Sequence, residues 1–477
     1  MIPIQTYKGR RVAVFGLGRT GITAARALKA GGAEVSAWDD SEPAREKAIA
    51  AGLDLDDLNR RDWGDIAALI LSPGVPLTHP KPHRMVELAK AVGAPVIGDI
   101  ELFAQALNAL PSRRRPKIIG ITGTNGKSTT TALIGHILRS TGRNAIVAGN
   151  IGDAILAQDP PRAGSYYVLE LSSYQIDLTQ SLHCDVAIML NISPDHLERH
   201  GGFDNYFEAK IRLFEMQAPD GIAVIGIDDD ETNACYSRLR RERGEEFVIP
   251  ISAGRVFARG VFALGSRVYE ALDSASVPLV DLKQARALPG QHNAQNAAAA
   301  MAAVRALGVG GRAAAEAMKS FGGLPHRQEV VAEHNGVRFI NDSKATNALA
   351  ALQALGSYEN IYWIAGGRGK DDDLSVMRPG YENVAKAFLI GEAEEAFAAE
   401  LDGRLAYERC GEMASAVRAA FAQARADGAA SPVILLSPAA ASFDQFANFE
   451  ARGAAFAQHA LQLEDSAEDG EAVESVA

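Results

Sequence analysis

The sequence has few cysteines, no excess of positive charge and no long apolar run, and each of these shortages excludes a class of protein. The three cysteines, Cys184, Cys235 and Cys410, lie far apart and form no CxxC pair, so neither a disulfide framework nor a zinc cluster is indicated. A net charge of −11 argues against a nucleic acid partner, because binding to phosphate backbones depends on Lys and Arg. No apolar run reaches the ~20 residues of a membrane-spanning helix, and the N-terminus has no signal-peptide pattern. We therefore expect a cytoplasmic monomer without membrane insertion.

The length and the order of apolar runs predict several α/β domains. The 477 residues exceed the roughly 250–300 that one hydrophobic core normally serves. Strand-like runs such as "RVAVFGLG" alternate with helical patterns such as "TAARALKAGG", which is typical of βαβ units and a parallel sheet. This rhythm restarts near Lys117 and again after "GGLPHR".

We predict three α/β domains, each with a mostly parallel sheet. The first is Rossmann-like, the second is a P-loop-type ATPase and the third is again Rossmann-like. A tail with six acids and no base follows, and we expect it to be disordered. The predicted boundaries are 1–112, 113–322, 323–462 and, for the tail, 463–477.

A glycine-rich stretch, "TGTNGKST" over 122–129, lies between a strand pattern and a helical pattern. Its glycines let backbone N–H groups turn inward, while Lys127 and Ser128 offer an ammonium and a hydroxyl suited to phosphate and magnesium. The common P-loop pattern has glycine where this chain has Ile121. A tight turn with a solvated lysine is the alternative, but the order strand, loop, Gly-Lys-Ser and helix favours ATP as ligand.

A lysine shares the apolar side of a predicted helix in "FDNYFEAKIRLFE". Lys210 falls on the stripe formed by residues such as Tyr206 and Phe214, and a lysine at the edge of such a stripe can simply extend its amine to solvent. Glu170, inside the strand pattern "YYVLELSS", would be costly to bury unpaired. His196 follows another strand, and the carboxyl ends of parallel strands are where ligands bind. These side chains suit a hard cation such as Mg²⁺ or Mn²⁺.

Seven motifs in order resemble the Mur ligase family over nearly the whole chain. They are "GTNGKST", "ELSSYQ", "NISPDHLERH", "AKIRLFE", "GLPHRQE", "NDSKATN" and "SPAAASFDQFANFEARG". The last two resemble the branch of the family that adds D-glutamate. The resemblance implies an ATP-dependent amide ligase of peptidoglycan precursor synthesis, with UDP-N-acetylmuramoyl-L-alanine, D-glutamate and ATP as substrates and an acyl phosphate as intermediate.

The resemblance also implies roles for individual residues. The implied catalytic residues are Lys127, Glu170, His196, Lys210 and Arg327. Magnesium ligands would be Ser128, Glu170, His196 and Lys210, the last carbamylated by CO2, in a site with up to two ions. ATP would contact Gly123, Thr124, Asn125, Gly126, Lys127, Ser128, Thr129, Asn293, Asn296, Arg327 and Asp342. The UDP-substrate would contact Arg19, Thr20, Ser72, Pro73, Gly74 and Asn150, and D-glutamate would contact Lys344, Thr346, Lys370, Ser442, Phe443 and Phe449. Arg368 stands where a relative has an acid, which leaves the binding of the D-glutamate side chain open.

A complete GxGxxG, "GLGRTG", leaves a second interpretation of the N-terminal domain. With Asp39 eighteen residues after Gly21, the pattern by itself is that of a nicotinamide dinucleotide domain. Nothing later in the chain indicates hydride chemistry, and the resemblance assigns the domain to UDP. Two further alternatives are a folylpolyglutamate-type ligase and a non-catalytic nucleotide-binding protein. The presence of Lys127, Glu170, His196 and Lys210 disfavours only the second of these.

Overall fold

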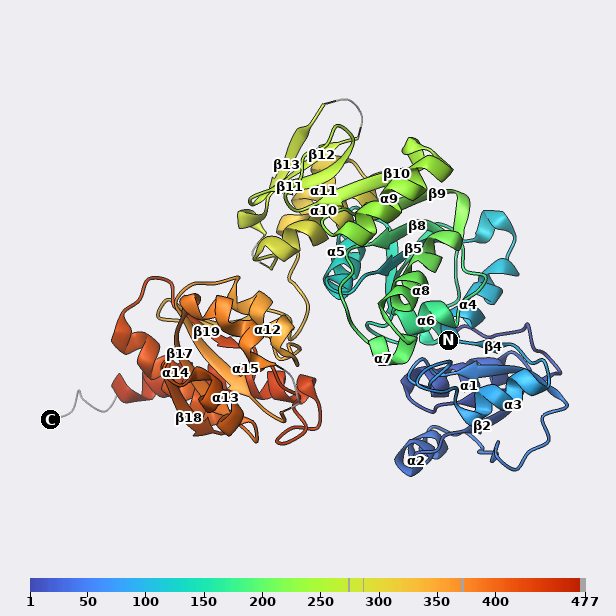
Figure 1. Cartoon of the computed structure of the whole chain (residues 1–477), viewed down its shortest axis with the longest axis horizontal. Helices are drawn as coiled ribbons and strands as arrows, with labels where there is room; N and C mark the ends of the chain where they lie inside the picture. Colours follow the sequence, from blue (N-terminus) through green and yellow to red (C-terminus); the bar gives the residue numbers. More distant parts are fainter. Residues whose placement is uncertain (273–274, 286, 370–372, 472–477) are drawn as a thin grey trace. The chain divides into compact units, whose positions relative to one another are not determined.

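The computed structural model describes residues 1–272, 275–285, 287–369 and 373–471 (Figure 1). The chain forms two compact units: the first is Met1–Asp281 with Ala294–Ser320, and the second is Leu282–Asn293 with Phe321–Ala477. Two sheets lie in the first unit and one in the second, which confirms the predicted α/β class with three sheets. Across the described ranges, no helix combines the length and hydrophobicity needed to cross a membrane.

The first sheet is parallel, with the order β2-β1-β3-β4. Its strands are β1 (Arg11–Phe15), β2 (Glu34–Trp38), β3 (Ile66–Leu71) and β4 (Val96–Ile97). The helices are α1 (Arg19–Ala30), α2 (Glu42–Ala50), α3 (Arg84–Ala91) and α4 (Asp99–Asn108). The turn from β1 into α1 requires glycine, because a Cβ on Gly21 would lie 1.9 Å from the carbonyl oxygen of Gly16. This close approach brings the start of α1 against the carboxyl end of β1.

The second sheet has nine strands in the order β13-β12-β11-β10-β9-β8-β5-β7-β6. They are β5 (Lys117–Thr122), β6 (Asn144–Gly149), β7 (Ser165–Glu170), β8 (Cys184–Met189), β9 (Gln217–Gly226), β10 (Val248–Ser252), β11 (Gly260–Leu264), β12 (Arg267–Ala271) and β13 (Val277–Asp281). Pairing is parallel from β6 to β11, and β12 and β13 extend the sheet in antiparallel fashion. The helices are α5 (Lys127–Ser140), α6 (Ser173–Asp177), α7 (Leu197–His200), α8 (Phe203–Glu215), α9 (Asp230–Arg243), α10 (Gln291–Ala306) and α11 (Gly311–Lys319).

The first two sheets are joined by polar bonds and by a shared core. The buried carboxylate of Glu101 on α4 accepts the backbone N–H groups of Gln180 and Ser181 at 2.7 and 2.8 Å. It also accepts the Ser181 hydroxyl at 2.7 Å. The rings of Phe103 and Tyr167 pack with centroids 5.0 Å apart. The boundary between 112 and 113 stays a prediction, and the packing is continuous across it.

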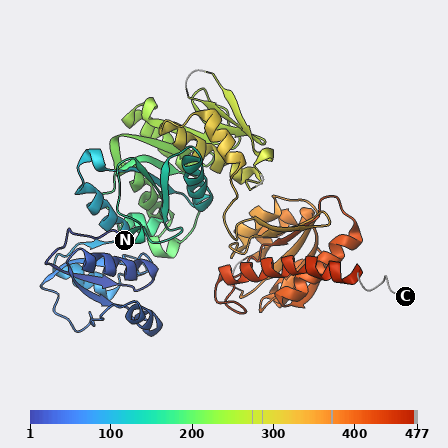
Figure 2. The same ribbon diagram turned by 180° about the vertical axis from the view of Figure 1, so that it is seen from behind.

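The sheet of the second unit has the order β14-β15-β19-β16-β17-β18, with only β14 antiparallel. Its strands are β14 (Glu329–His334), β15 (Val337–Asn341), β16 (Ile361–Gly366), β17 (Val384–Ile390), β18 (Tyr407–Gly411) and β19 (Val433–Leu436). Helices α12 (Ala348–Leu355) and α13 (Glu394–Leu401) pack on the face that holds Trp363. Helices α14 (Met413–Asp427) and α15 (Phe449–Glu471) cover the other face, where α15 runs along the sheet (Figure 2).

The acidic tail departs from the sequence expectation. Helix α15 continues to Glu471, so the first nine residues of the segment expected to be disordered are helical. The helix is anchored by buried Phe456 and Ala460, and Glu and Ala are good helix formers that allow it to continue. Residues 472–477 lie outside the described residues.

Candidate active site

The glycine-rich stretch forms a loop between β5 and α5, as its pattern predicts. Gly126 has φ +82, and a Cβ there would lie 2.1 Å from Oδ1 of Asn296, so the loop packs closely against α10. The amine of Lys127 donates to the carbonyl oxygens of Gly123 at 3.0 Å and Thr124 at 2.7 Å. Ser128 and Thr129 begin α5, where N–H groups and the helix dipole favour an anion.

Two residues that the sequence interpretation did not select hold this loop in place. Asn191, after β8, accepts the N–H of Asn125 at 2.9 Å. The hydroxyls of Tyr206 and Thr124 lie 3.1 Å apart, and Thr124 also accepts the N–H of Ser193 at 3.0 Å. The sequence patterns that contain these residues are "NIS" and the aromatic stripe of α8, but neither pattern shows which atoms contact the loop.

Lys210 is buried beside the phosphate loop and does not reach solvent. Its side chain is 2% exposed, its amine donates to the Gly123 carbonyl at 2.8 Å, and it lies 4.7 Å from the centre of the Tyr206 ring. Burial lowers the pKa of Lys210 well below its usual value, and the nearby charge of Lys127 lowers it further. Asp195 and Glu170 oppose the shift. The structure thus favours a neutral amine here and excludes the interpretation in which Lys210 extends its amine to water.

Glu170 ends β7 with only 2% of its surface exposed. One carboxylate oxygen accepts from the side-chain amide of Asn150 at 2.9 Å. The other is buried and has no hydrogen-bond partner among the described residues. A buried carboxylate oxygen without a donor is costly, so this atom is suited to a cation.

His196 lies at the start of the short helix α7 and is half-exposed. It adopts a left-handed backbone, φ 52, lies 3.5 Å from the carboxylate of Asp195 and packs against the Tyr174 ring at 5.3 Å. The neighbouring His200 is buried against the Ser173 hydroxyl at 2.9 Å. Burial, followed by the nearby Lys210, lowers the pKa of His200 to about 4, so His200 is a neutral packing residue.

The side chains present fit a magnesium site that is completed by phosphate. In the described part of the chain, no group of three or more His, Cys, Asp and Glu could hold a metal by itself. Mg²⁺ normally binds through one or two carboxylates with phosphate oxygens and water as the other ligands. The unpartnered oxygen of Glu170 and the buried hydroxyl of Ser128 match that pattern.

In the N-terminal part, the predicted UDP contacts lie around the start of α1. Thr20, Ser72 and Pro73 border one small cavity of about 10 Å³. Arg19 is exposed, and the carbonyl of Gly74 accepts from Arg199 at 2.8 Å. Asp39, the residue that raised the dinucleotide alternative, accepts the N–H groups of Leu17 at 2.6 Å and Ser41 at 2.8 Å. Its carboxylate is therefore engaged in holding the glycine loop.

The second unit contains three of the predicted nucleotide contacts, Asn293, Arg327 and Asp342. Asp342 is buried at the end of β15, accepts the Ser437 hydroxyl at 2.9 Å and lies 3.3 Å from the N–H of Gln328. Burial raises the pKa of Asp342 to about 7, while Ser437 and the Arg327 charge oppose the rise. Asn293, near the start of α10, donates to the Pro289 carbonyl at 2.6 Å.

The predicted D-glutamate contacts lie on neighbouring loops of the same unit. The amine of Lys344 lies 4.0 Å from the centre of the Phe449 ring. Ser442 is buried, Thr346 is half-buried and Phe443 is 61% exposed. Lys370 lies outside the described residues.

Arg452 ties these loops together, and sequence interpretation missed it. Its side chain is 1% exposed and donates to the hydroxyl and carbonyl of Ser343 and to the carbonyl of Ala440 at 2.9–3.0 Å. Arg368 is bonded through its backbone to Ala441 and forms an exposed ion pair with Glu392 at 3.3 Å. No feature of "NFEARG" indicates that its arginine points inward.

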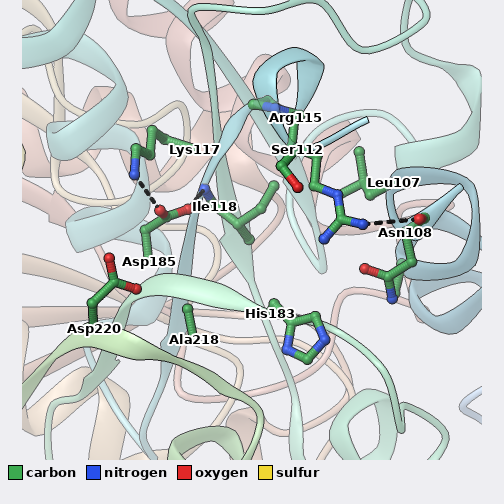
Figure 3. Close-up of a pocket in the computed structure, with 12 residues that line it drawn as sticks. Leu107, Asn108, Ser112, Arg115, Lys117, Ile118, His183, Asp185, Ala218 and Asp220 are labelled. Carbon is green, nitrogen blue, oxygen red and sulfur yellow. Dashed lines mark hydrogen bonds and ion pairs between the residues drawn. The ribbon is translucent and has the colours of Figure 1, made fainter. Parts of the chain in front are cut away.

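A pocket of about 270 Å³ lies elsewhere in the first unit (Figure 3). It includes Lys117, the first residue of β5, whereas the phosphate loop follows the last residue of that strand. The amine of Lys117 pairs with Asp185 at 2.5 Å, and Arg115 donates to the carbonyls of Leu110 and Asn108. None of the predicted site residues lines this pocket.

The chain matches two family profiles, the Mur ligase middle domain over residues 121–304 and the Mur ligase glutamate ligase domain over residues 326–440. The protein therefore belongs to the Mur ligase family. It is 52% identical over 469 residues to the UDP-N-acetylmuramoylalanine–D-glutamate ligase of Phenylobacterium zucineum, covering 98% of this chain and 100% of that protein. It is 53% identical over 456 residues to the ligase of the same name from Caulobacter sp. (strain K31), covering 96% and 97%.

Solved structures of more distant ligases share the fold. The UDP-N-acetylmuramate–alanine ligase of Thermotoga maritima matches with a TM-score of 0.58 at 16% identity, covering 96% of this chain and 99% of that one. A UDP-N-acetylmuramoyl-L-alanyl-D-glutamate–2,6-diaminopimelate ligase matches with a TM-score of 0.57 at 19% identity, covering 98% and 94%. The three-sheet α/β architecture is thus that of the Mur ligases.

Proposed function

We propose that this protein is an ATP-dependent ligase that joins D-glutamate to UDP-N-acetylmuramoyl-L-alanine. The observation that carries the proposal is the similarity, at about half of all positions and over nearly the whole length, to ligases of that name. The phosphate loop, buried Lys210 and the unpartnered oxygen of Glu170 support the proposal, because they are the kinds of group that phosphate and a cation require. We infer three domains with the boundaries 1–112, 113–322 and 323–462, and a cytoplasmic monomer.

The first half of the reaction is transfer of a phosphoryl group. A carboxylate oxygen of the alanyl group attacks the γ-phosphorus of ATP, the bond to the β,γ-bridging oxygen breaks, and ADP leaves with that oxygen. The loop residues Gly123 to Thr129 hold the phosphates, and Lys127 turns its amine from the loop carbonyls to the phosphate oxygens. The transition state carries spread negative charge, so positioning and charge stabilisation account for most of the acceleration.

The second half forms the amide. The neutral amine of D-glutamate attacks the carbonyl carbon of the acyl phosphate, phosphate leaves with the bonding electrons, and the nitrogen loses a proton. In this proposal Lys344, Thr346, Ser442 and Phe449 bind D-glutamate, together with Phe443 and Lys370. Arg327, Asp342, Asn293 and Asn296 bind the nucleotide.

Magnesium, for which Mn²⁺ can substitute, supplies positive charge at the phosphates when bound. Ser128 and Glu170 would hold a first ion, and His196 a second. The unpartnered oxygen of Glu170 supports this assignment, because a cation satisfies it without a hydrogen-bond donor.

Lys210 is proposed to carry a carbamate. Its uncharged amine attacks CO2, a C–N bond forms, and one proton is released. Burial, which favours the uncharged amine, therefore also favours the reaction. The anionic product can share the cation with Glu170, whereas an ammonium would repel it.

The carbamate can be tested by activity and by spectroscopy. Lys210→Ala should abolish turnover, and a short carboxylic acid should restore part of it by replacing the missing carboxylate. Wild-type protein incubated with ¹³C-bicarbonate should show a carbamate carbon resonance that is absent from Lys210→Ala and present in the exposed-site control Lys90→Ala. Turnover near the wild-type rate in Lys210→Ala would remove the carbamate from the proposal.

The activity is tested by phosphate release from ATP with UDP-N-acetylmuramoyl-L-alanine and either D-glutamate, L-glutamate or no amino acid. Release should require both the UDP-substrate and the D-isomer. Release with a folate substrate would favour the folylpolyglutamate-type alternative. ATP binding without release in any mixture would favour the non-catalytic alternative.

A further inference from the structure

A buried acid lies beneath the glycine loop of the N-terminal sheet, at a position that no implied role uses. Asp99 is the first residue of α4, and only 4% of it is exposed. In the described part of the chain, neither of its carboxylate oxygens has a hydrogen-bond partner. A carboxylate in this state is costly, so the position calls for a chemical explanation.

The cavity beside Asp99 connects it to the proposed diphosphate site. Its lining comes from three elements: α1, the end of β3 with the following loop, and α4. Thr20 and Ser72, two of the proposed UDP contacts, border it together with Asp99. At about 10 Å³ it has room for one water-sized group, so a ligand at those hydroxyls lies just across the cavity from the carboxyl group.

No other titratable side chain borders this cavity, whose other lining residues are Gly21, Ala24, Ile70, Leu71 and Pro73. Burial raises the pKa of Asp99 to about 6; the backbone N–H groups of Ile100 and of Asp99 itself lie close enough to oppose the rise, although neither has hydrogen-bond geometry to the carboxylate. No charged side chain contributes. Burial is therefore the main cause of the shift, and no charged side chain offsets a negative charge placed across the cavity.

We propose that Asp99 is a positioning residue that takes up one proton when the diphosphate of the UDP-linked substrate binds at the glycine loop. In the free protein near pH 7 the carboxyl group is mostly ionised. A diphosphate on the other side of the cavity adds negative charge, which favours the protonated carboxyl. The acid then donates its proton in a hydrogen bond towards Ser72 or Thr20, directly or through one water. This inference rests on the proposed function.

The test is calorimetric titration of wild-type protein with UDP-N-acetylmuramoyl-L-alanine in two buffers of different ionisation enthalpy. This ligand suits the test because its diphosphate is esterified at both ends and does not titrate near neutral pH. At pH 7 we expect proton uptake of up to about 0.9 per ligand, because a carboxyl group with a pKa of about 6 is roughly nine-tenths ionised there, and affinity at pH 8 should be at least fivefold weaker than at pH 6. The wild-type series stands even if a variant fails to fold.

Two variants identify the group that takes up the proton. Asp99→Asn should bind the ligand with uptake near zero and with less than twofold change between pH 6 and 8. Asp62→Asn removes an exposed carboxylate from the same domain and should behave as wild type. Wild-type binding without proton uptake, or unchanged uptake in Asp99→Asn, would overturn this inference alone. Absence of binding at any pH would overturn the proposed function, and the inference with it.

Discussion

Replacing Asp342 by asparagine should stabilise the second unit in mildly alkaline solution and weaken the use of ATP. The carboxyl group is buried, and its pKa lies at about 7 instead of 3.8. Between these values the folded protein keeps a proton that the unfolded chain has released, so stability falls as pH rises through this window and levels off above it. A difference of about three pH units corresponds to roughly 4 kcal/mol at pH 8, to order of magnitude.

Asparagine avoids this loss because it carries no charge and can keep both hydrogen bonds. Its oxygen can accept the N–H of Gln328, and its amide nitrogen can donate to the Ser437 hydroxyl, which rotates to accept. At pH 5 the folded acid is still protonated but the unfolded chain has already released its proton, so the gain from asparagine should be about 1–2 kcal/mol, well below its value at pH 8. In the proposed function Asp342 binds the nucleotide, so the KM for ATP should rise about tenfold or more.

Scanning calorimetry of the full chain at pH 5, 7 and 8.5 measures the first effect. The transition of the second unit should rise by about 5–15 °C in Asp342→Asn at pH 8.5 and by a clearly smaller amount at pH 5. Asp402→Asn, which removes an exposed carboxylate from the same unit, is the control and should show no pH-dependent gain. A lower melting temperature of Asp342→Asn at every pH would refute the reasoning, because it would mean that the ionised carboxylate is satisfied in the folded protein.

Three further predictions concern residues that hold the loops. Glu101→Ala leaves two backbone N–H groups without acceptors and should cost about 2–5 kcal/mol in urea unfolding, whereas exposed Glu87→Ala should cost almost nothing. Arg452→Lys keeps the charge but loses the guanidinium hydrogen bonds that join Ser343 to Ala440. The KM for D-glutamate should rise about tenfold and the KM for ATP less than twofold. Equal changes in both KM values would contradict a role of Arg452 in holding the D-glutamate loops. Gly21→Ala would place a methyl group 1.9 Å from the Gly16 carbonyl oxygen, whereas a Cβ on Gly18 meets no atom within 4 Å. The melting temperature should therefore fall strongly in Gly21→Ala and only slightly in Gly18→Ala.

Much of the architecture could be predicted because it depends on local patterns. Apolar runs separated by helical periodicity indicate parallel α/β sheets, and the loop before Lys127 has the glycines that its left-handed turns require. The antiparallel β12 and β13 could not be placed in this way, since their pairing depends on register across the sheet. A disordered tail was predicted from residue 463 because composition alone does not show that the preceding turns of α15 are anchored by Phe456.

Candidate site residues could be selected from the sequence only where they lie in a recognisable motif or break a local pattern. Lys210 was selected because a cation on an apolar stripe is unusual, yet the stripe could not show whether the amine reaches water or the Gly123 carbonyl. Glu101 and Arg452 were missed for a different reason. Their partners lie about 80 and 110 residues away along the chain, and an acid or an arginine in a helix is ordinarily a surface residue.

Two buried carboxylates of the first unit, Asp99 and Glu170, lie near the two loops proposed to hold phosphates. Of the side chains in the described ranges that have a buried polar atom without a hydrogen-bond partner, only Asp99 and Glu170 are acids. An unpartnered carboxylate costs more than an unpartnered amide or phenol, because it loses the hydration of a full charge. Glu170 lies near Lys210 on α8, and in the proposed function a cation bound with ATP neutralises it. Asp99 borders a cavity with no cationic side chain, so a proton is the species that can neutralise it there. In the proposed function the same structural problem thus has two chemical solutions, a metal ion at the loop before α5 and a proton at the loop before α1.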